Sequence, residues 1–228
     1  MDDYAFGLPP SVSLPAPPGK PFPVRRIFCV GQNYKDHMKE MGGNPATDVP
    51  FFFMKPAGAI VQNGKPMPYP AGTADLQHEV ELVVAIKGGG RNIPPEKADD
   101  IIFGYAVGLD MTKRDLQSEL RKQGRPWEMS KSFDFSAPCS AIALKSRTGA
   151  LASGKIECKV NGQVRQSADL GGMIWGVPQI IHTLSQQVEI MPGDLIFTGT
   201  PAGVAPVVKG DQIEATIAGL EPLVTRIE

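Results

Sequence analysis

Two acidic residues, Glu79 and Glu81, stand at the start of an apolar segment that continues to Ile86. Alternate side chains of a β-strand point to the same face, so both carboxylates are expected to lie side by side. They would repel each other, and burying them without a partner would be costly. A divalent cation with oxygen ligands would relieve both problems, whereas a strand end open to solvent would leave two hydrated acids.

A third acid, Asp110, ends the apolar segment of residues 101–110, which also has the pattern of a strand. A carboxylate at the tip of a buried strand is held rigidly beside an open loop, a common position for a functional group. Three carboxylates in a chain with few histidines suit Mg²⁺ or Mn²⁺ better than Zn²⁺. Asp110 could instead serve only to cap the helix that is expected after it.

The chain has three histidines, and His37 is followed by Glu40 one helical turn later. A carboxylate that touches an imidazole orients it and raises its basicity, so this pair could take a proton from water. The alternative is a surface ion pair of little energetic value. Strand alternation turns His78 away from the acidic pair, so we interpret it as structural, and His182 as a core or surface residue of an apolar helix.

Four further polar residues could contact a substrate or an intermediate. Lys131 lies among small and apolar residues, where it could stabilise a developing enolate or could simply be an exposed lysine. Arg114 and Gln117 share one face of a predicted helix and could bind an anionic substrate. The small-residue loop that contains Thr200 could approach a ligand closely, or it could form an ordinary tight turn.

The sequence predicts a mainly β (α+β) frame with short helices for these groups. Glycine (25) and proline (22) are abundant among the 228 residues, which favours many turns between strands. Apolar patterns predict strands over residues 26–30, 51–54, 59–61, 67–69, 80–86, 101–110, 138–146, 155–160, 163–166, 195–198, 212–217 and 223–227. Turn and capping signals predict helices over residues 33–41, 95–100, 112–123 and 178–186.

Composition limits the class of protein. A proline-rich N-terminal arm, residues 1–23, precedes what we predict to be a single domain, residues 24–228. The net charge of −1 gives no support for a nucleic-acid surface, and no apolar run approaches the ~20 residues that span a membrane. The three cysteines form no CxxC pair and the N-terminus does not resemble a secretory signal, so we predict a cytoplasmic protein with reduced thiols.

Five short motifs occur in order along the chain, at residues 31–37 (GQNYKDH), 78–82 (HEVEL), 109–115 (LDMTKRD), 131–134 (KSFD) and 199–203 (GTPAG). Together they resemble the fumarylacetoacetate hydrolase family, in its short single-domain branch that includes acylpyruvate and fumarylpyruvate hydrolases. The resemblance runs from about Arg26 to the C-terminus. One departure is Ala205, where the family pattern often has glycine; a need for positive φ there would strain the loop.

The resemblance implies a mixed β-roll of the fumarylacetoacetate hydrolase C-terminal type, a homodimer, and Mg²⁺ or Mn²⁺ as cofactor. It also implies that the helix near His37 belongs to a mobile lid over the site. The implied site residues are the metal ligands Glu79, Glu81 and Asp110, the catalytic residues His37, Glu40 and Lys131, and the substrate-binding residues Arg114, Gln117 and Thr200.

The function implied by the resemblance is hydrolytic cleavage of the C3–C4 bond of a 2,4-dioxo acid, a small 2-oxo acid substrate. His37 and Glu40 would activate a water, and Lys131 with the metal would stabilise a pyruvate enolate. Arg114 would suit a second carboxylate, so fumarylpyruvate is the first choice of substrate. The alternatives are an oxaloacetate decarboxylase, a 2-hydroxymuconate-type isomerase or decarboxylase, and a non-catalytic metal-stabilised β protein.

Overall fold

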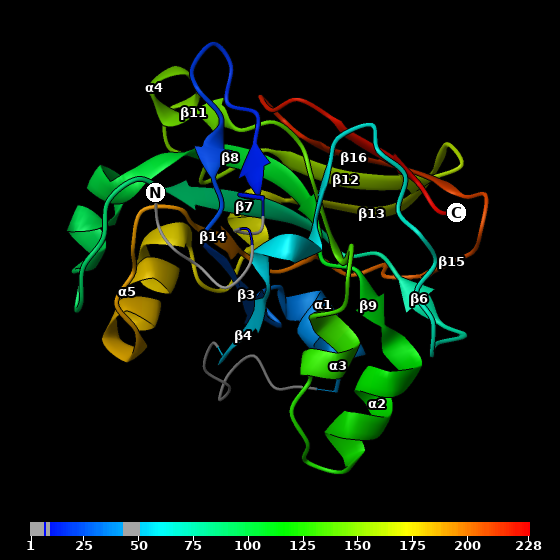
Figure 1. The fold of residues 1–228 in the computed structure, drawn as a ribbon. Coiled ribbons are helices and arrows are strands. Elements are labelled where there is room, and N and C mark those ends of the chain that lie inside the picture. The colour runs from blue at the N-terminus through cyan, green and yellow to red at the C-terminus, as the bar shows by residue number, and fades with distance from the viewer. Residues whose placement is uncertain (1–6, 8–9, 43–50) are drawn as a thin grey trace.

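The structure is a computed structural model that describes residues 7, 10–42 and 51–228. Strands dominate it, and the short helices lie at the periphery (Figure 1). This arrangement confirms the predicted mainly β class with short helices. None of the helices in the described ranges combines the length and the apolar character needed to cross a membrane.

A curled mixed sheet of eight strands forms the centre of the described structure (Figure 1). Its neighbours run in the order β4-β3-β14-β7-β8-β10-β5, and β11 pairs with β8 outside this path. Its strands are β3 (Arg26–Gly31), β4 (Phe51–Lys55), β5 (Ile60–Gln62), β7 (Val80–Ile86), β8 (Ile102–Leu109), β10 (Ala137–Cys139), β11 (Ala143–Leu144) and β14 (Asp194–Phe197). Strand β7 is antiparallel to both β8 and β14, and β14 is parallel to β3.

Three smaller sheets surround the large one. The four-stranded antiparallel sheet has the order β13-β12-β16-β17, with β12 (Lys155–Val160), β13 (Gln163–Asp169), β16 (Gln212–Ile217) and β17 (Leu223–Arg226). The three-stranded sheet contains β6 (Leu76–Gln77), β9 (Thr112–Lys113) and β15 (Pro206–Val207). The hairpin β1 (Ser13–Leu14) and β2 (Phe22–Pro23) lies within the predicted arm, of which residues 1–6 and 8–9 are outside the described ranges.

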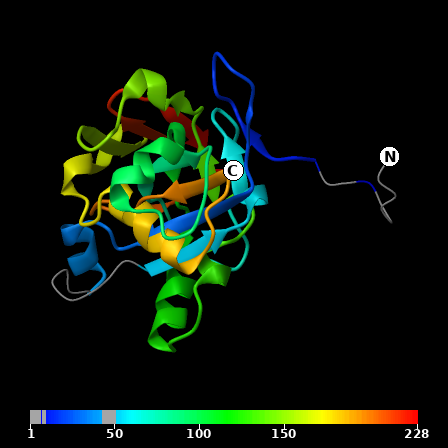
Figure 2. The ribbon, with the colours of Figure 1, turned by 90° about the vertical axis from the view of Figure 1, so that its left-hand side faces the viewer.

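The helices are short. They are α1 (Lys35–Glu40), α2 (Arg114–Lys122), α3 (Glu128–Lys131), α4 (Lys145–Thr148) and α5 (Val177–Gln187), with 3₁₀ turns η1 (Ala57–Ala59), η2 (Pro95–Ile101) and η3 (Leu170–Gly172). Helices α1, α2 and α3 gather at one end of the large sheet (Figure 1). Helix α2 and the β1–β2 hairpin project from opposite sides of the body (Figure 2).

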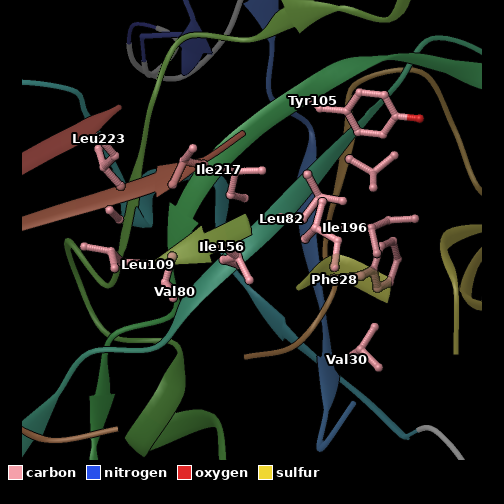
Figure 3. Packing of buried hydrophobic residues seen from close by; sticks show 14 of the residues in the cluster. Phe28, Val30, Val80, Leu82, Tyr105, Leu109, Ile156, Ile196, Ile217 and Leu223 are labelled. Carbon is pink, nitrogen blue, oxygen red and sulfur yellow. The ribbon is translucent and has the colours of Figure 1, made fainter. Parts of the chain in front are cut away.

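The large sheet is buried on both faces, and strand β7 shows why. Its even-numbered residues, such as Val80 and Leu82, pack in one core with Ile156 and Ile217 of the four-stranded sheet (Figure 3). Its odd-numbered residues Val83 and Ala85 pack in a second core on the other face. Glu79 and Glu81 have the same parity as this second set, so they continue a buried face rather than a solvent-exposed one.

Two predicted strands differ in the structure. Residues 67–69 form no strand; Met67 makes only an isolated bridge to Ile227, because the prolines on both sides of it lack the N–H that a ladder requires. The predicted strand 138–146 is divided into β10, β11 and the helix α4. The Ser140 hydroxyl accepts a hydrogen bond from the Val107 amide, which replaces a backbone partner and interrupts the pairing.

Two predicted helices are shorter than expected. The helix predicted over 112–123 begins only at Arg114, because Thr112 and Lys113 pair with β6. The helix predicted over 33–41 begins at Lys35, and Gly42 beyond it has a φ of 73°, as expected of a helix stop. The other glycine of that predicted stop, Gly43, lies outside the described residues.

Candidate metal centre and active site

Three acids meet where β7 begins and β8 ends. The antiparallel register places Val80 opposite Leu109, and the Asp110 amide donates to the Glu79 carbonyl at 2.8 Å. One carboxylate oxygen from each of Glu79, Glu81 and Asp110 lies within 4.8 Å of the others, and all three side chains are buried. The pairing of the two strands therefore brings Asp110 close to Glu81 and Glu79, although it lies at least 29 residues from them in the sequence.

Two cations neutralise part of this charge. Lys131 Nζ lies 2.6 Å from Glu79 Oε2 and 2.8 Å from Asp110 Oδ2, and Arg114 donates to Glu79 Oε1. Burial acts to raise the pKa of Glu79, but the charges of Lys131 and Arg114 outweigh it and hold that pKa below its usual range. Burial likewise acts to lower the pKa of Lys131, and the two carboxylates raise it above its ordinary value. Lys131 is therefore a buried, charged residue rather than an exposed lysine.

Glu81 and one oxygen of Asp110 are poorly compensated. The hydrogen-bond partner of the Glu81 carboxylate is the Gly199 amide, at 2.7 Å. Burial, then the charges of Asp110 and Glu79, raise the pKa of Glu81 well above its usual value. Asp110 Oδ1 is buried and has no hydrogen-bond partner of suitable geometry among the described residues, although Lys55 Nζ lies 2.9 Å away.

These observations test whether the residues fit a metal ion. The donors are all carboxylate oxygens, Glu81 lies beside two other acids, and Asp110 Oδ1 has an ion pair with Lys55 but no hydrogen bond among the described residues. A divalent cation would remove the repulsion and occupy that oxygen. The donor set therefore fits Mg²⁺ or Mn²⁺.

The predicted imidazole–carboxylate pair is formed on helix α1. His37 Nδ1 lies 3.2 Å from Glu40 Oε2, and the Gly203 amide donates to Glu40 Oε1 at 3.2 Å. Burial lowers the pKa of His37, while the Glu79 charge and the Glu40 hydrogen bond act in the opposite direction. The buried imidazole is therefore neutral near pH 7 and is oriented by a carboxylate held at both oxygens.

One cavity unites the predicted residues. It is lined by eight of the nine, namely His37, Glu79, Glu81, Asp110, Arg114, Gln117, Lys131 and Thr200. Glu40, the ninth, lies behind His37. The remaining wall is partly apolar and includes Val30, Met41, Phe53 and Trp127.

Arg114 and Gln117 form the buried face of helix α2, as their spacing predicts. The Arg114 side chain donates through Nε to Gln77 at 2.9 Å, and its terminal nitrogens donate to Gln117 and to Glu79. Arg114 thus connects the helix to a candidate metal ligand. A substrate carboxylate that bound here would share the guanidinium with these partners.

The other histidines lie outside the cavity. His78 Nδ1 contacts Gln166 Oε1 at 2.9 Å, and His182 Nδ1 contacts the Ile93 carbonyl at 2.8 Å. Ala205 is not among the non-glycine residues with positive φ, so the strain considered for that position does not arise. Gly203 does need to be glycine: its φ is 97°, and a Cβ would lie 2.2 Å from the Arg165 carbonyl.

Lys55 was missed by the sequence reasoning. It ends β4 and is fully buried, and its Nζ contacts Asp110 Oδ1 at 2.9 Å, the Met111 carbonyl at 3.2 Å and the Lys131 carbonyl. A lysine that directly follows an apolar strand and precedes Pro56 was the available signal. Lys55 adds a third cation beside the acids and contacts the backbone of Lys131.

Comparison with known proteins gives consistent matches. The family model described as fumarylacetoacetate (FAA) hydrolase C-terminal matches residues 26–228. The chain is 42% identical over 204 residues to the mitochondrial oxaloacetate tautomerase of Homo sapiens, covering 90% of this chain and 92% of that protein. It is 40% identical over 198 residues to the mitochondrial oxaloacetate decarboxylase of Dictyostelium discoideum, covering 86% and 90%.

A solved structure is also very similar. The crystal structure of fumarylpyruvate hydrolase from Pseudomonas aeruginosa in complex with Mn²⁺ and pyruvate matches with a TM-score of 0.96 and 44% sequence identity. The match covers 99% of each chain. The similar proteins thus differ in their named activities.

Proposed function

The chain belongs to the fumarylacetoacetate hydrolase family, and from that premise we propose that it hydrolyses a carbon–carbon bond of a 2,4-dioxo acid. The mixed β-roll implied by the sequence resemblance is confirmed by the structural match. The similar proteins are enzymes, so the chain is taken to be an enzyme of this family. The observation that carries the hydrolytic assignment is that His37, whose Nδ1 contacts Glu40, lines the same cavity as the three acids and Lys131.

The carboxylates of Glu79, Glu81 and Asp110 would hold Mg²⁺ or Mn²⁺, and such an ion, when bound, supplies Lewis-acid polarisation of a 2-oxo acid. The Mn²⁺ and pyruvate of the Pseudomonas structure support this cofactor class and this end of the substrate. The charges of Lys131 and Arg114 hold the pKa of Glu79 below its usual range, and Arg114 also donates to Glu79 Oε1.

The proposed reaction starts with proton transfer to His37. The neutral imidazole accepts a proton from water, Glu40 stabilises the resulting charge, and the water oxygen bonds to the C4 carbonyl carbon. The C3–C4 bond then breaks, and its electron pair remains on the pyruvate fragment as an enolate. The Lys131 ammonium stabilises this developing charge, and the proton held by His37 is returned to C3, which yields pyruvate beside the released carboxylic acid and restores the neutral imidazole.

Fumarylpyruvate, which would give fumarate and pyruvate, is the first substrate to test. Arg114 would contact its second carboxylate, in competition with the Glu79, Gln77 and Gln117 contacts. An acylpyruvate without a second carboxylate could bind without displacing these Arg114 contacts. The homodimer and the cytoplasmic location stay predictions.

A second candidate function is decarboxylation or tautomerisation of oxaloacetate. The two similar oxaloacetate enzymes support it, and it needs the acids and Lys131 but no attacking water. An isomerase or decarboxylase of the 2-hydroxymuconate type would use the same groups. The His37–Glu40 pair favours the hydrolase because it provides a base for water; decarboxylating relatives also carry such a pair, so the products decide between the two.

The test is a substrate panel with the purified protein and Mg²⁺ or Mn²⁺. Fumarylpyruvate, acetylpyruvate and oxaloacetate are followed by loss of enol absorbance, and the products are identified. Formation of fumarate or acetate together with pyruvate supports the hydrolase. Formation of CO₂, or keto–enol exchange without cleavage, supports the second candidate. A lack of turnover of every 2,4-dioxo acid would reject the hydrolase.

A further inference from the structure

Val80, the first residue of β7, lies between Glu79 and Glu81 and is held in a closed ring of three hydrogen bonds. Its amide donates to Gln166 Oε1 at 3.1 Å, and its carbonyl accepts from the Thr200 hydroxyl at 2.9 Å. The Gln166 Nε2 group donates to Thr200 Oγ1 at 2.7 Å, which completes the ring. The three residues come from β7, β13 and the loop after β14, so the ring joins segments far apart in the sequence.

The ring is buried. Val80 and Gln166 are 0% exposed, and Thr200, which lines the cavity, is 2% exposed, so bulk solvent has little access to its hydrogen bonds. Buried polar networks of this kind are rigid when every member is satisfied and are costly to disrupt. Gln166 also accepts from His78 Nδ1 at 2.9 Å and donates to the Pro201 carbonyl at 2.8 Å.

The orientation of the Gln166 amide follows from its partners. The Val80 amide can only donate and the Pro201 carbonyl can only accept, so Oε1 faces the strand and Nε2 faces the loop. The Thr200 hydroxyl has a single hydrogen, which is directed to the Val80 carbonyl. This hydroxyl therefore serves the protein framework and has no hydrogen to offer a substrate.

The position of the ring connects it to the metal ligands. The Val80 amide belongs to the peptide group shared with Glu79, and the Val80 carbonyl belongs to the peptide group shared with Glu81. Holding both groups fixes the directions in which the two carboxylates leave the strand. We propose that Gln166 and the Thr200 hydroxyl are positioning groups that set the separation of Glu79 and Glu81 for metal binding; this rests on the proposed metal-dependent function.

The test measures Mn²⁺ affinity of the metal-free protein by electron paramagnetic resonance of free Mn²⁺. Gln166→Met and Thr200→Val each open the ring, and each is expected to weaken Mn²⁺ binding about 10- to 100-fold, as for other groups that orient metal ligands. The double variant should bind about as weakly as either single variant, because one broken bond already opens the ring. kcat/KM on the preferred substrate should fall in parallel.

Two matched variants separate positioning from other effects. Gln163→Met makes the same substitution on the exposed face of β13 and should leave the Mn²⁺ affinity unchanged. Thr200→Ser keeps the hydroxyl and should retain the Mn²⁺ affinity that Thr200→Val loses. The comparison of Thr200→Val with Thr200→Ser still tests the proposal if Gln166→Met does not fold.

Other outcomes would overturn the proposal. Unchanged Mn²⁺ affinity with a raised KM in Thr200→Val would mean that the hydroxyl contacts substrate directly. Additive losses in the double variant would mean that the two residues act independently. Failure of the wild-type protein to bind Mn²⁺ would instead reject the metal-dependent function itself, so the two failures can be told apart.

Discussion

The large sheet carries buried acids at two opposite ends, and the two ends are built differently. Asp194 begins β14 beside Arg26, the first residue of the parallel strand β3. Its Oδ1 accepts from Arg25 at 3.1 Å and Arg26 at 3.0 Å, and its Oδ2 accepts from Arg26 at 3.0 Å and the Met191 amide at 2.9 Å. Both oxygens of this single acid are satisfied by nitrogen donors.

At the other end, three acids share an incomplete set of partners. Glu79 is well paired, but Glu81 relies on the Gly199 amide, and Asp110 Oδ1 has an ion pair with Lys55 but no hydrogen bond within the described ranges. The pKa of Glu81 is raised, which means that the fold holds this carboxylate where its charge is unfavourable. A satisfied buried acid stabilises structure, whereas crowded acids with incomplete hydrogen bonding indicate a site for a cation.

Glu81→Gln is expected to have the largest effect at the end of the sheet that contains the three acids. Loss of a direct ligand should weaken Mn²⁺ binding by more than the roughly 100-fold seen for supporting groups, and metal-dependent turnover should disappear. Stability of the metal-free protein should stay equal or rise, because a repelling charge is removed. Mn²⁺ titration, turnover and thermal unfolding measure these effects, and unchanged activity would remove Glu81 from the ligand set.

Lys131→Met should have the next largest effect. The ammonium is proposed to stabilise the enolate, so kcat should fall about 10²- to 10³-fold, as for the loss of other groups that stabilise developing charge. Mn²⁺ affinity should be retained or increase, since a cation beside Glu79 and Asp110 is removed. Steady-state kinetics together with Mn²⁺ titration check this; a parallel loss of metal binding would make Lys131 a structural residue.

The His37–Glu40 pair predicts a pH effect. Burial lowers the pKa of His37, so kcat/KM should persist below about pH 6.5, the ordinary histidine value, and decline as pH falls through the lowered pKa. Glu40 raises the pKa of His37, so Glu40→Gln should move this decline to lower pH and reduce kcat/KM by about 10- to 100-fold.

The contribution of His37 to folding stability also declines as pH falls. Its pKa is lower in the folded than in the unfolded protein, so the contribution is complete above about pH 6.5 and is lost as pH falls through the folded value. A His37→Gln variant, compared with the wild type in pH–activity and pH–stability profiles, isolates the imidazole. An acid decline at the same pH in both proteins would assign it to another group.

Asp194→Asn should have the smallest effect on function. It weakens the contacts with Arg25 and Arg26, whose side chains are 46% and 23% exposed, and should destabilise the fold by about 1–3 kcal/mol. Urea unfolding measures that loss, while Mn²⁺ affinity and kcat should match the wild type. A large change in Mn²⁺ affinity would show that the two ends of the sheet are not independent.

Several of the site residues could be predicted because their spacing is local. Glu79 and Glu81 follow the two-residue period of a strand, and Arg114 and Gln117 follow the turn of a helix. Apolar patterning also predicted the strands that carry the acids, since both faces of that sheet are buried. The predicted strand at 138–146 is confirmed only in part, as β10 and β11, because Ser140 bonds to Val107, a contact between segments that no local pattern encodes.

The burial of Gln166, by contrast, could not be predicted from local spacing. Its register in β13 shifts relative to β12 at Cys158 and Lys159, leaving Arg165 unpaired next to it. This bulge directs Gln166 into the interior, although Gln163, Val164 and Arg165 before it are exposed. Nothing in the alternation of the sequence marks it as buried, and its partners lie on other strands.

The sequence by itself determined which residue types stand in pairs at strand and helix spacing, because those periods depend only on local backbone geometry. Tertiary structure decided that Asp110 meets Glu79 and Glu81, that Lys55 and Lys131 are buried against them, and that Gln166 and Thr200 enclose Val80. The physical reason is that strand register, a bulge and the packing of distant segments set these distances, and each depends on contacts across the whole sheet.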